Sequence, residues 1–325
     1  MVEMLSVVAP LFLIILLGFA AGFAQRFREA SPYLNGFVFY FALPTFLFTA
    51  MTQAPAVGSV PWAMPLIVLV VTPALSIGLY YLCRGFGGAT RAGAAPTSLA
   101  GTFGNVGYFG IPVSIGVLGP EAGLAAGLVH VVHNVFYMNG YPLVRTVVTT
   151  GEAGGRAESF GQLWRTRIWP VLRRGVLLNP MFSAIALALI VAFGDVGVPA
   201  LIEEPVSLLG ATAVPLALFC IGLALHPALE GVRSGGVPLL PIALGTLTKL
   251  LVLPVLTWAA VLLFYDQLGP LWAGTLVIMA ATPSSTTAFL FSSEYDGDGR
   301  LAAAILVAST GLSLITLPLV AELLL

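Results

Sequence analysis

Residues 104–112 read Gly-Asn-Val-Gly-Tyr-Phe-Gly-Ile-Pro in the middle of a long apolar run, 93–118. In a helix interior glycine costs about 1 kcal/mol and proline about 3 kcal/mol, so we expect this segment to be unwound. A second interruption, Ala-Thr-Pro-Ser-Ser-Thr-Thr at 281–287, lies at the same depth of the run 270–294. Two broken helices predict a crossing that lines a site, because irregular backbone at membrane depth must be buried in protein or face a water-filled cavity. The alternative is a pair of ordinary proline kinks.

The composition predicts a membrane protein. Hydrophobic residues make up 58% of the chain and charged residues 8%, against about 25% charged in soluble domains. A helix needs roughly 20 apolar residues to cross a bilayer, and the chain supplies ten such runs. We predict membrane spans at 4–24, 33–53, 61–83, 93–118, 121–148, 176–193, 204–225, 238–264, 270–294 and 300–323.

Charge predicts the orientation. All Lys and Arg residues except Lys249 fall at alternate connections between the predicted spans, and basic residues near span ends stay on the cytoplasmic side. We therefore expect a multi-pass protein of the bacterial inner (cell) membrane, with both termini periplasmic. The polar segment 149–175 is predicted to be a cytoplasmic linker between two five-helix halves, 1–148 and 176–325.

Five spans in each half imply that related halves lie in the membrane with opposite orientation. Two sequence matches support such a repeat. Leu43-Pro44 resembles Val214-Pro215, and Ile111-Pro112 precedes Thr282-Pro283 by the same spacing. The fold predicted is all-α, with two inverted repeats and with helices 4 and 9 broken and crossing.

Further polar residues fall inside the predicted spans. His130, His133, Asn134 and Tyr137 have helical spacing, so they form one stripe that either carries a coupled proton or makes interhelical hydrogen bonds. Lys249 is the one basic residue in mid-span, and it either neutralises a bound anion or bridges to backbone carbonyls. The pairs Gly18/Gly22 and Gly123/Gly127 predict close-packing helix faces.

Three segments carry a resemblance to the auxin efflux carrier family. Asn105 with Gly110-Ile111-Pro112 is similar to that family's fourth helix, the stretch from Pro283 to Glu294-Tyr295 to its ninth, and Leu317-Pro318 to its tenth. The family includes the plant auxin carriers and bacterial carriers for malonate and malate. Predicted spans 2 and 3 contain no Asp or Lys, where the plant carriers place supporting charges, which argues against auxin itself.

The resemblance implies a fold like that of bile acid symporters and sodium–proton antiporters. It implies homodimers, a scaffold of helices 1, 2, 6 and 7, and a transport domain of helices 3–5 and 8–10 that moves like an elevator. It also implies that Asn105 binds a substrate carboxylate at the crossing. Half-helix N-termini there would expose N–H groups that suit such an anion. The predicted substrate-binding residues are Gly104, Asn105, Val106, Gly107, Pro112, Thr282, Pro283, Ser284, Ser285 and Thr286.

These features predict a secondary transporter of a small organic anion, a carboxylate such as malonate, malate or an auxin-like acid. Neither broken segment contains Asp or Glu, which favours an anionic passenger over a cation. A coupled proton is expected more than sodium, because the histidines could carry a proton and no feature of the chain indicates a sodium site. We expect no enzyme activity, cofactor, metal or nucleic acid. A solute or ion channel and a membrane sensor are the alternatives, which flux measurements would distinguish from a carrier.

Overall fold

The computed structural model describes residues 2–53, 60–142, 144–145, 165, 169–173, 178–194, 197–233, 236–295 and 299–324. These residues form helices and short connections, and the described part of the chain contains no β-strand beyond one isolated bridge. The all-α prediction is confirmed for this part. Of the predicted linker, the structure describes the short helix α11, Trp169–Leu172, and the single residues Arg165 and Arg173.

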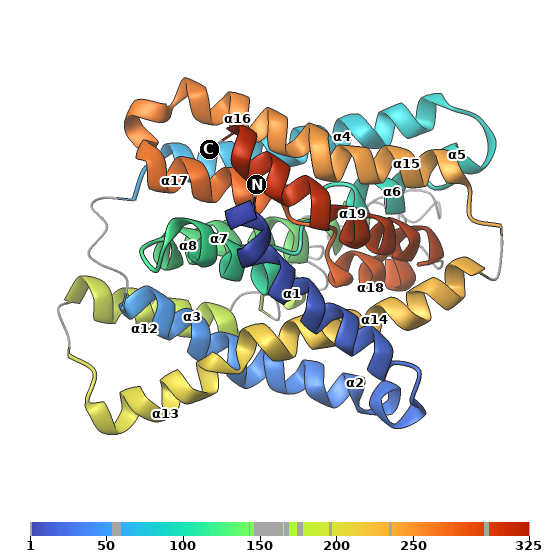
Figure 1. The fold of residues 1–325 in the computed structure, drawn as a ribbon. Coiled ribbons are helices and arrows are strands. Elements are labelled where there is room, and N and C mark those ends of the chain that lie inside the picture. Colours follow the sequence, from blue (N-terminus) through green and yellow to red (C-terminus); the bar gives the residue numbers. More distant parts are fainter. Residues whose placement is uncertain are drawn as a thin grey trace.

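Each predicted span overlaps one or more described helices (Figure 1). The first half contains α1 (Val2–Ala21), α2 (Gln25–Phe37), η1 (Val38–Ala42), α3 (Leu43–Thr52), α4 (Ala63–Gly85), α5 (Gly88–Ala92), α6 (Ala94–Ala100), η2 (Val106–Gly110), α7 (Ile111–Leu118), α8 (Ala122–Val135) and η3 (Phe136–Gly140). The second half contains α12 (Pro180–Gly194), α13 (Ala200–Ala211), α14 (Ala213–Arg233), α15 (Leu239–Leu247), η6 (Thr248–Val252), α16 (Leu253–Leu263), α17 (Tyr265–Ala281), α18 (Thr286–Tyr295) and α19 (Arg300–Leu324).

Among the described residues, 5 continuous helical stretches are long and apolar enough to cross a membrane. They are Gln25–Thr52, Ala63–Gly85, Ala200–Pro227, Leu239–Leu263 and Arg300–Leu324. Shorter apolar helices cover Ala9–Ala21, Val106–Leu118 and Pro180–Ala192. The stretch beginning at Gln25 starts earlier than the predicted span, so Arg26 and Arg28 lie in a helix and not in a connection.

Proline explains where the long helices change their winding. The elements η1, η2, η3 and η6 are π-helical turns of 5 residues, and each stands directly before a pair ending in proline. These prolines are Pro44, Pro112, Pro142 and Pro254. A proline ring clashes with the carbonyl four residues earlier and removes a hydrogen bond, and a wider turn accommodates both effects without ending the helix.

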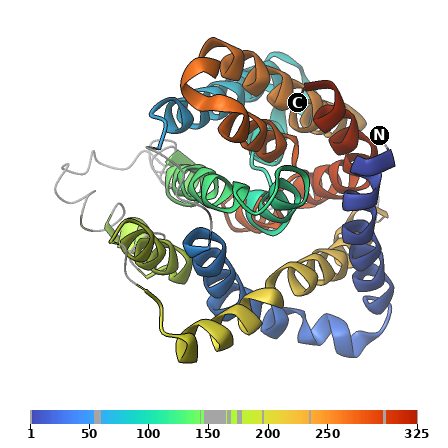
Figure 2. The same ribbon diagram turned by 60° about the vertical axis from the view of Figure 1, so that its left-hand side comes forward.

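The helices form two groups. In both views, α1, α2, α3, α12, α13 and α14 lie along one side, and α4 to α8 with α15 to α19 lie along the other (Figures 1 and 2). Within the first group, α1 packs along α14 and α3 packs against α12 and α13. The two groups meet where α3 contacts α8 and where α14 contacts α19.

Glycine allows the closest of these contacts. A Cβ atom added to Gly18 of α1 would lie 2.1 Å from the Phe219 carbonyl oxygen, and one added to Gly222 of α14 would lie 2.1 Å from the Ile15 carbonyl oxygen. The two backbones therefore touch with no side chain between them. Gly123 of α8 approaches the Ala50 carbonyl of α3 in the same way, with an added Cβ at 2.8 Å. The predicted close-packing faces are thus confirmed.

We expect Gly222→Ala to lower the thermal unfolding midpoint of the purified protein in detergent. The added methyl forces α1 and α14 apart, and overpacking costs about 1–3 kcal/mol. Gly78→Ala is the matched control, because a Cβ at Gly78 meets nothing within 4 Å and alanine is the better helix former. Equal midpoints for the two variants would contradict the backbone contact.

Candidate functional site

The two broken helices cross and pair through their backbones. Gly104 and Ser284 form an antiparallel bridge. The Asn105 N–H donates to the Pro283 carbonyl at 2.8 Å, and the Ser285 N–H donates to the Phe103 carbonyl at 2.8 Å. This pairing replaces helical hydrogen bonds that both segments lose at the break. The predicted crossing at the two interruptions is therefore present.

The break is shorter than the glycine and proline content predicts. Only residues 101–105 leave the helix, whereas 106–110 form a π-helical turn and Ile111 begins α7. The expectation that the whole of 104–112 is unwound is wrong. The Asn105 carbonyl accepts hydrogen bonds from the Phe109 and Gly110 N–H groups, both at 3.1 Å, and so restarts the helix early.

The two prolines of the proposed sequence repeat therefore differ in position. Pro112 lies in the first turn of α7, beyond the π-helical turn, whereas Pro283 lies within the break. The bridge instead opposes Gly104 to Ser284, so those residues occupy equivalent places at the crossing. Ile111-Pro112 and Thr282-Pro283 therefore do not occupy equivalent positions in the structure. Leu43-Pro44 and Val214-Pro215, in contrast, both lie in the first turn of a helix, α3 or α14, that continues a preceding one.

Two half-helices begin at the crossing. The turn η2 starts at Val106, and the N–H groups of Val106, Gly107 and Tyr108 have no backbone acceptor within the described part of the chain. The helix α18 starts at Thr286, and the Ser285 hydroxyl accepts from the Thr287 N–H at 3.2 Å, as an N-cap side chain does. Both starts carry the positive end of a helix dipole.

A cavity of about 750 Å³ opens at these two starts. Of the predicted substrate-binding residues, it is lined by Gly104, Asn105, Val106, Gly107, Ser285 and Thr286. His130 and Asn134 line it as well, and the described residues of its lining include Arg28 but no Asp or Glu. The Asn105 side chain is 5% exposed, and it makes no hydrogen bond within the described residues. A buried amide without a partner has its hydrogen-bonding capacity available to a ligand.

The other predicted binding residues lie outside the cavity lining and hold the crossing together. The Pro283 carbonyl accepts from Asn105, as described above. The Thr282 hydroxyl donates to the Met279 carbonyl at 2.8 Å, and the Ser284 N–H donates to the Ser309 hydroxyl of α19 at 3.1 Å. Pro112 is part of α7 and does not line the cavity.

The polar stripe of α8 and η3 supports the crossing from its side. The Gly104 N–H donates to His133 Nε2 at 3.3 Å, which requires that nitrogen to be unprotonated. His130 packs against Gly107, where an added Cβ would lie 2.7 Å from the imidazole, and Asn134 bonds to His130 at 2.9 Å. The Tyr137 hydroxyl donates to Thr102 Oγ1 at 2.6 Å.

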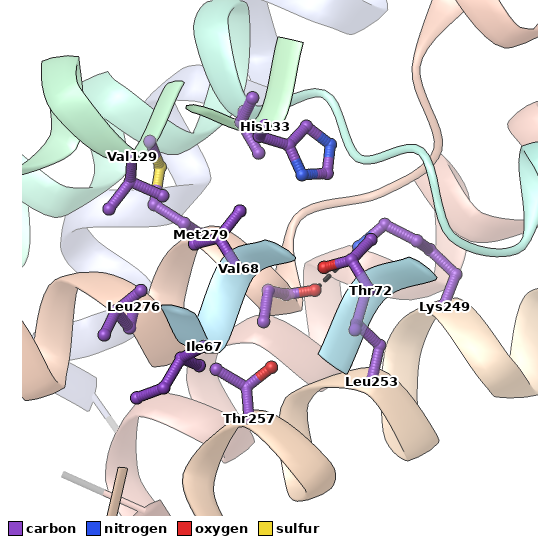
Figure 3. Close-up of a pocket in the computed structure, with 12 residues that line it drawn as sticks. Ile67, Val68, Thr72, Val129, His133, Lys249, Leu253, Thr257, Leu276 and Met279 are labelled. Atoms are coloured by element: carbon purple, nitrogen blue, oxygen red, sulfur yellow. Dashed lines mark hydrogen bonds between the residues drawn. The ribbon is translucent and has the colours of Figure 1, made fainter. Parts of the chain in front are cut away.

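Lys249 lines a different space from the large cavity. It is 0% exposed, and its Nζ donates to the Ala280 carbonyl at 2.6 Å, at the C-terminal end of α17. Figure 3 shows this hydrogen bond beside a small space of about 30 Å³ that Lys249, His133 and Val106 help to line. No Asp or Glu lines that space among the described residues. Of the two roles predicted for Lys249, the structure shows the contact of the second, a bridge to a backbone carbonyl.

The sequence did not indicate how much of the cavity wall comes from α2, α12 and α14. Arg28, Asn35 and Asn179 are polar members of that wall. Arg28 and Asn35 are seven residues apart, which places them on one face of α2, and this spacing was the available signal. The Asn35 amide donates to the Ser31 carbonyl at 2.9 Å, so it is engaged within its own helix.

Comparison with known proteins decides the family. Residues 4–321 match the sequence model of a family described as membrane transport protein. The chain belongs to this family. The resemblance to auxin efflux carriers is thereby confirmed, and the chain is a multi-pass membrane transporter.

Relatives of this transporter span nearly its whole length. A protein of Rhizobium meliloti named "Putative malonate transporter" is 25% identical over 97% of this chain and 94% of its own. A protein of Methanothermobacter thermautotrophicus named "Uncharacterized transporter" is 26% identical over 90% of this chain and 88% of its own. A protein of the same description from Methanocaldococcus jannaschii is 24% identical over 97% of both chains.

Proposed function

We propose that this transporter is a secondary carrier of a small organic anion, a carboxylate such as malonate, malate or an auxin-like acid. The observation that carries the proposal is the unpartnered Asn105 amide, which lies where two half-helices begin in one large cavity. Those half-helices direct the positive ends of their dipoles toward the same space. Among the residues that the structure describes, the cavity lining adds Arg28 and no carboxylate, which favours an anion there.

Lys249 completes the electrostatic arrangement of the crossing. The ends of α6 and α17 bring helix C-termini, and hence negative dipole ends, to the same place as the N-termini. The Lys249 ammonium binds the last turn of α17 through Ala280. In the proposed mechanism it balances the C-terminal side, so that the N-terminal side keeps its attraction for the substrate.

The two spaces beside the crossing differ in size. This difference favours a carrier with alternating access over a channel. The cavity on the Asn105 side measures about 750 Å³, and the space on the Lys249 side only about 30 Å³. Val106 lines both and separates them. The large cavity includes Arg28 and Pro227, which flank connections predicted to be cytoplasmic. We assign this conformation to a carrier open to the cytoplasm, with both termini periplasmic, in a bacterial inner membrane.

The proposed architecture is ten membrane spans in two inverted repeats, 1–148 and 176–325, joined by the linker 149–175. The group of α1, α2, α3, α12, α13 and α14 corresponds to the scaffold, and α4–α8 with α15–α19 to the mobile transport domain. Two observations favour this division. The first group is joined internally by backbone contacts at Gly18 and Gly222, and the crossing lies entirely within the second group.

Malonate is the first substrate to test, because a relative bears that name and small dicarboxylates fit the proposed chemistry. Proton coupling is proposed through the histidines, since His130 lines the large cavity and His133 the small one. One of these histidines thus lines each of the two spaces. Sodium coupling has less support, because in the described part of the chain neither space is lined by the carboxylates that sodium sites commonly use.

We expect Asn105→Ala to weaken substrate binding by roughly 10- to 150-fold, because a hydrogen bond to a charged group contributes about 1.5–3 kcal/mol. Asn105→Asp should weaken it further by repulsion. Binding is measured by isothermal titration of the purified protein with malonate, malate, other dicarboxylates and indole acids. Uptake of the same compounds is measured in liposomes that contain the protein. Asn105 lies at the irregular crossing, so both variants should remain monodisperse.

Asn35→Ala is the matched control, since Asn35 lines the same cavity but its amide is already bonded to Ser31. It should bind with affinity close to that of the wild type. A folded Asn105→Ala protein with unaltered affinity would remove the crossing as the carboxylate site.

Proton coupling through the histidines predicts a second result. His130→Gln or His133→Gln should abolish the response of uptake to an imposed pH gradient and leave exchange of labelled for unlabelled substrate intact. Glutamine retains an acceptor for the Gly104 N–H but cannot carry the proton. His226→Gln, on α14 and outside both cavity linings, is the control. Unchanged pH dependence in both test variants would leave these residues as supports of the crossing.

The proposed architecture also predicts a homodimer formed through the scaffold helices. Native mass spectrometry of the protein released from detergent should show a dimer, and chemical cross-linking in membranes should trap it. A strictly monomeric protein that still transports would refute the dimer while leaving the carrier mechanism in place.

A further inference from the structure

The small space of about 30 Å³ beside the crossing, which we call the Lys249 space, is lined by four polar side chains in an otherwise apolar wall. They come from four consecutive parts of the fold, α4, α8, η6 and α16, and are Thr72, His133, Lys249 and Thr257 (Figure 3). Among the described residues, no Asp or Glu contributes to this lining.

Two threonine hydroxyls in the Lys249 space are unused. Thr72 and Thr257 are 6% and 5% exposed, and neither hydroxyl makes a hydrogen bond within the described residues. A threonine inside a helix can donate to the carbonyl four residues earlier, as Thr275 does to Leu271 at 2.7 Å. Thr72 and Thr257 do not, and in Figure 3 their hydroxyl groups point toward the space. Buried hydroxyls without a protein partner indicate a bound ligand or an ordered water.

Lys249 and His133 add further donors. An ammonium group has three N–H donors, and Lys249 uses one of them at the Ala280 carbonyl, so two remain. His133 Nε2 accepts from the Gly104 N–H, so a neutral imidazole carries its proton on Nδ1. That N–H has no acceptor among the described residues. With the two hydroxyls included, donors outnumber acceptors around the Lys249 space.

The charge of Lys249 also lacks a partner of opposite charge. The side chain is 0% exposed, and it makes no ion pair with a described residue. The C-terminal end of α17 at Ala280 supplies about half an elementary negative charge, but a dipole as a whole carries no net charge. A protonated Lys249 therefore leaves one positive charge in a region of low dielectric constant, where an unpaired charge is costly. A bound anion would neutralise that charge.

The size of the Lys249 space selects a small ion. A cavity needs roughly 10–15 Å³ to hold one water molecule, so about 30 Å³ accommodates one or two particles of that size and no carbon chain. A water molecule fits as well, but it must donate two hydrogens into a wall that consists mainly of donors. An anion accepts from every donor and requires no acceptor in return.

We propose that the Lys249 space binds one halide ion, such as chloride, held by the Lys249 ammonium and by the hydroxyls of Thr72 and Thr257. The four parts of the fold that line the space all belong to the group of α4–α8 and α15–α19. A bound ion would therefore join these helices to one another beside the crossing and stabilise that group. The inference rests on the Lys249 space alone and is independent of the substrate proposal.

The test measures thermal unfolding midpoints of the full-length protein in neutral detergent without substrate. Sodium chloride, sodium bromide and sodium methanesulfonate are compared at equal ionic strength. Methanesulfonate is too large for the space and carries no carboxylate that could bind at Asn105. We expect both halides to raise the midpoint above its value in methanesulfonate, with a shift that saturates as halide is added.

The double variant Thr72→Val/Thr257→Val removes both hydroxyls and keeps the shape of the side chains. It should weaken the apparent halide affinity by about 10-fold or more, because hydrogen bonds to a charged group are lost. Neither hydroxyl has a protein partner, so in methanesulfonate the variant should unfold at the same temperature as the wild type.

Thr275→Val is the matched control, a buried threonine on α17 whose hydroxyl donates to Leu271 and which lies outside the lining. It should keep the full halide shift. Crystals grown in bromide should show an anomalous scattering peak beside Lys249 Nζ. The absence of a halide shift, an equal shift in the double variant and the control, or a water alone at this position would overturn the proposal. None of these measurements requires transport, so they leave the proposed function to its own tests.

Discussion

Two backbone hydrogen bonds, from Asn105 to Pro283 and from Ser285 to Phe103, are the constraint on which the site depends. Each broken helix leaves peptide groups without helical partners, and inside a bilayer such groups have no water to bind. Pairing the two breaks with each other satisfies part of these groups, while the N–H groups of Val106, Gly107 and Tyr108 keep no backbone acceptor among the described residues. Because unpaired peptide groups are costly inside a bilayer, each break can be only a few residues long. The same pairing holds the ends of the half-helices close together.

That point is supported from three directions. His133 accepts the Gly104 N–H from the α8 side, Ser309 of α19 accepts the Ser284 N–H, and Lys249 binds Ala280 where α17 ends. The supports engage the backbone of the crossing and leave the Asn105 amide out. A rigid frame around one uncommitted polar group is the arrangement that a binding site requires, because the group need not be reorganised when a ligand arrives.

Sequence reasoning identified the all-helical class, the two breaks and their crossing, because glycine and proline have strong local costs that no packing removes. It overestimated the length of the break after Asn105. Helix propensities count the hydrogen bond that Pro112 removes, but they do not consider that a π-helical turn before the proline can accommodate it. It also predicted Thr282, Pro283 and Ser284 as binding residues, and in the structure these three lie outside the cavity lining and hydrogen-bond at the crossing. The contribution of α2, α12 and α14 to the cavity depends on how distant helices pack, and the composition of each helix alone does not contain that information.

The contacts that glycine permits differ between the α1/α14 interface and the α3/α8 interface. The difference lies in how closely backbone meets backbone. At the α1/α14 interface, Gly18 lies against the backbone of α14 and Gly222 against the backbone of α1. A shift of one helix along its axis would therefore push its carbonyl oxygens against the other helix. At α8 and α3, Gly123 also faces a carbonyl oxygen, that of Ala50, although at 2.8 Å from an added Cβ, and Gly127 faces the pliable Met51 side chain. The first interface is therefore closed by backbone from both helices, whereas the second, which joins the two groups of helices, includes a side chain that can change its conformation.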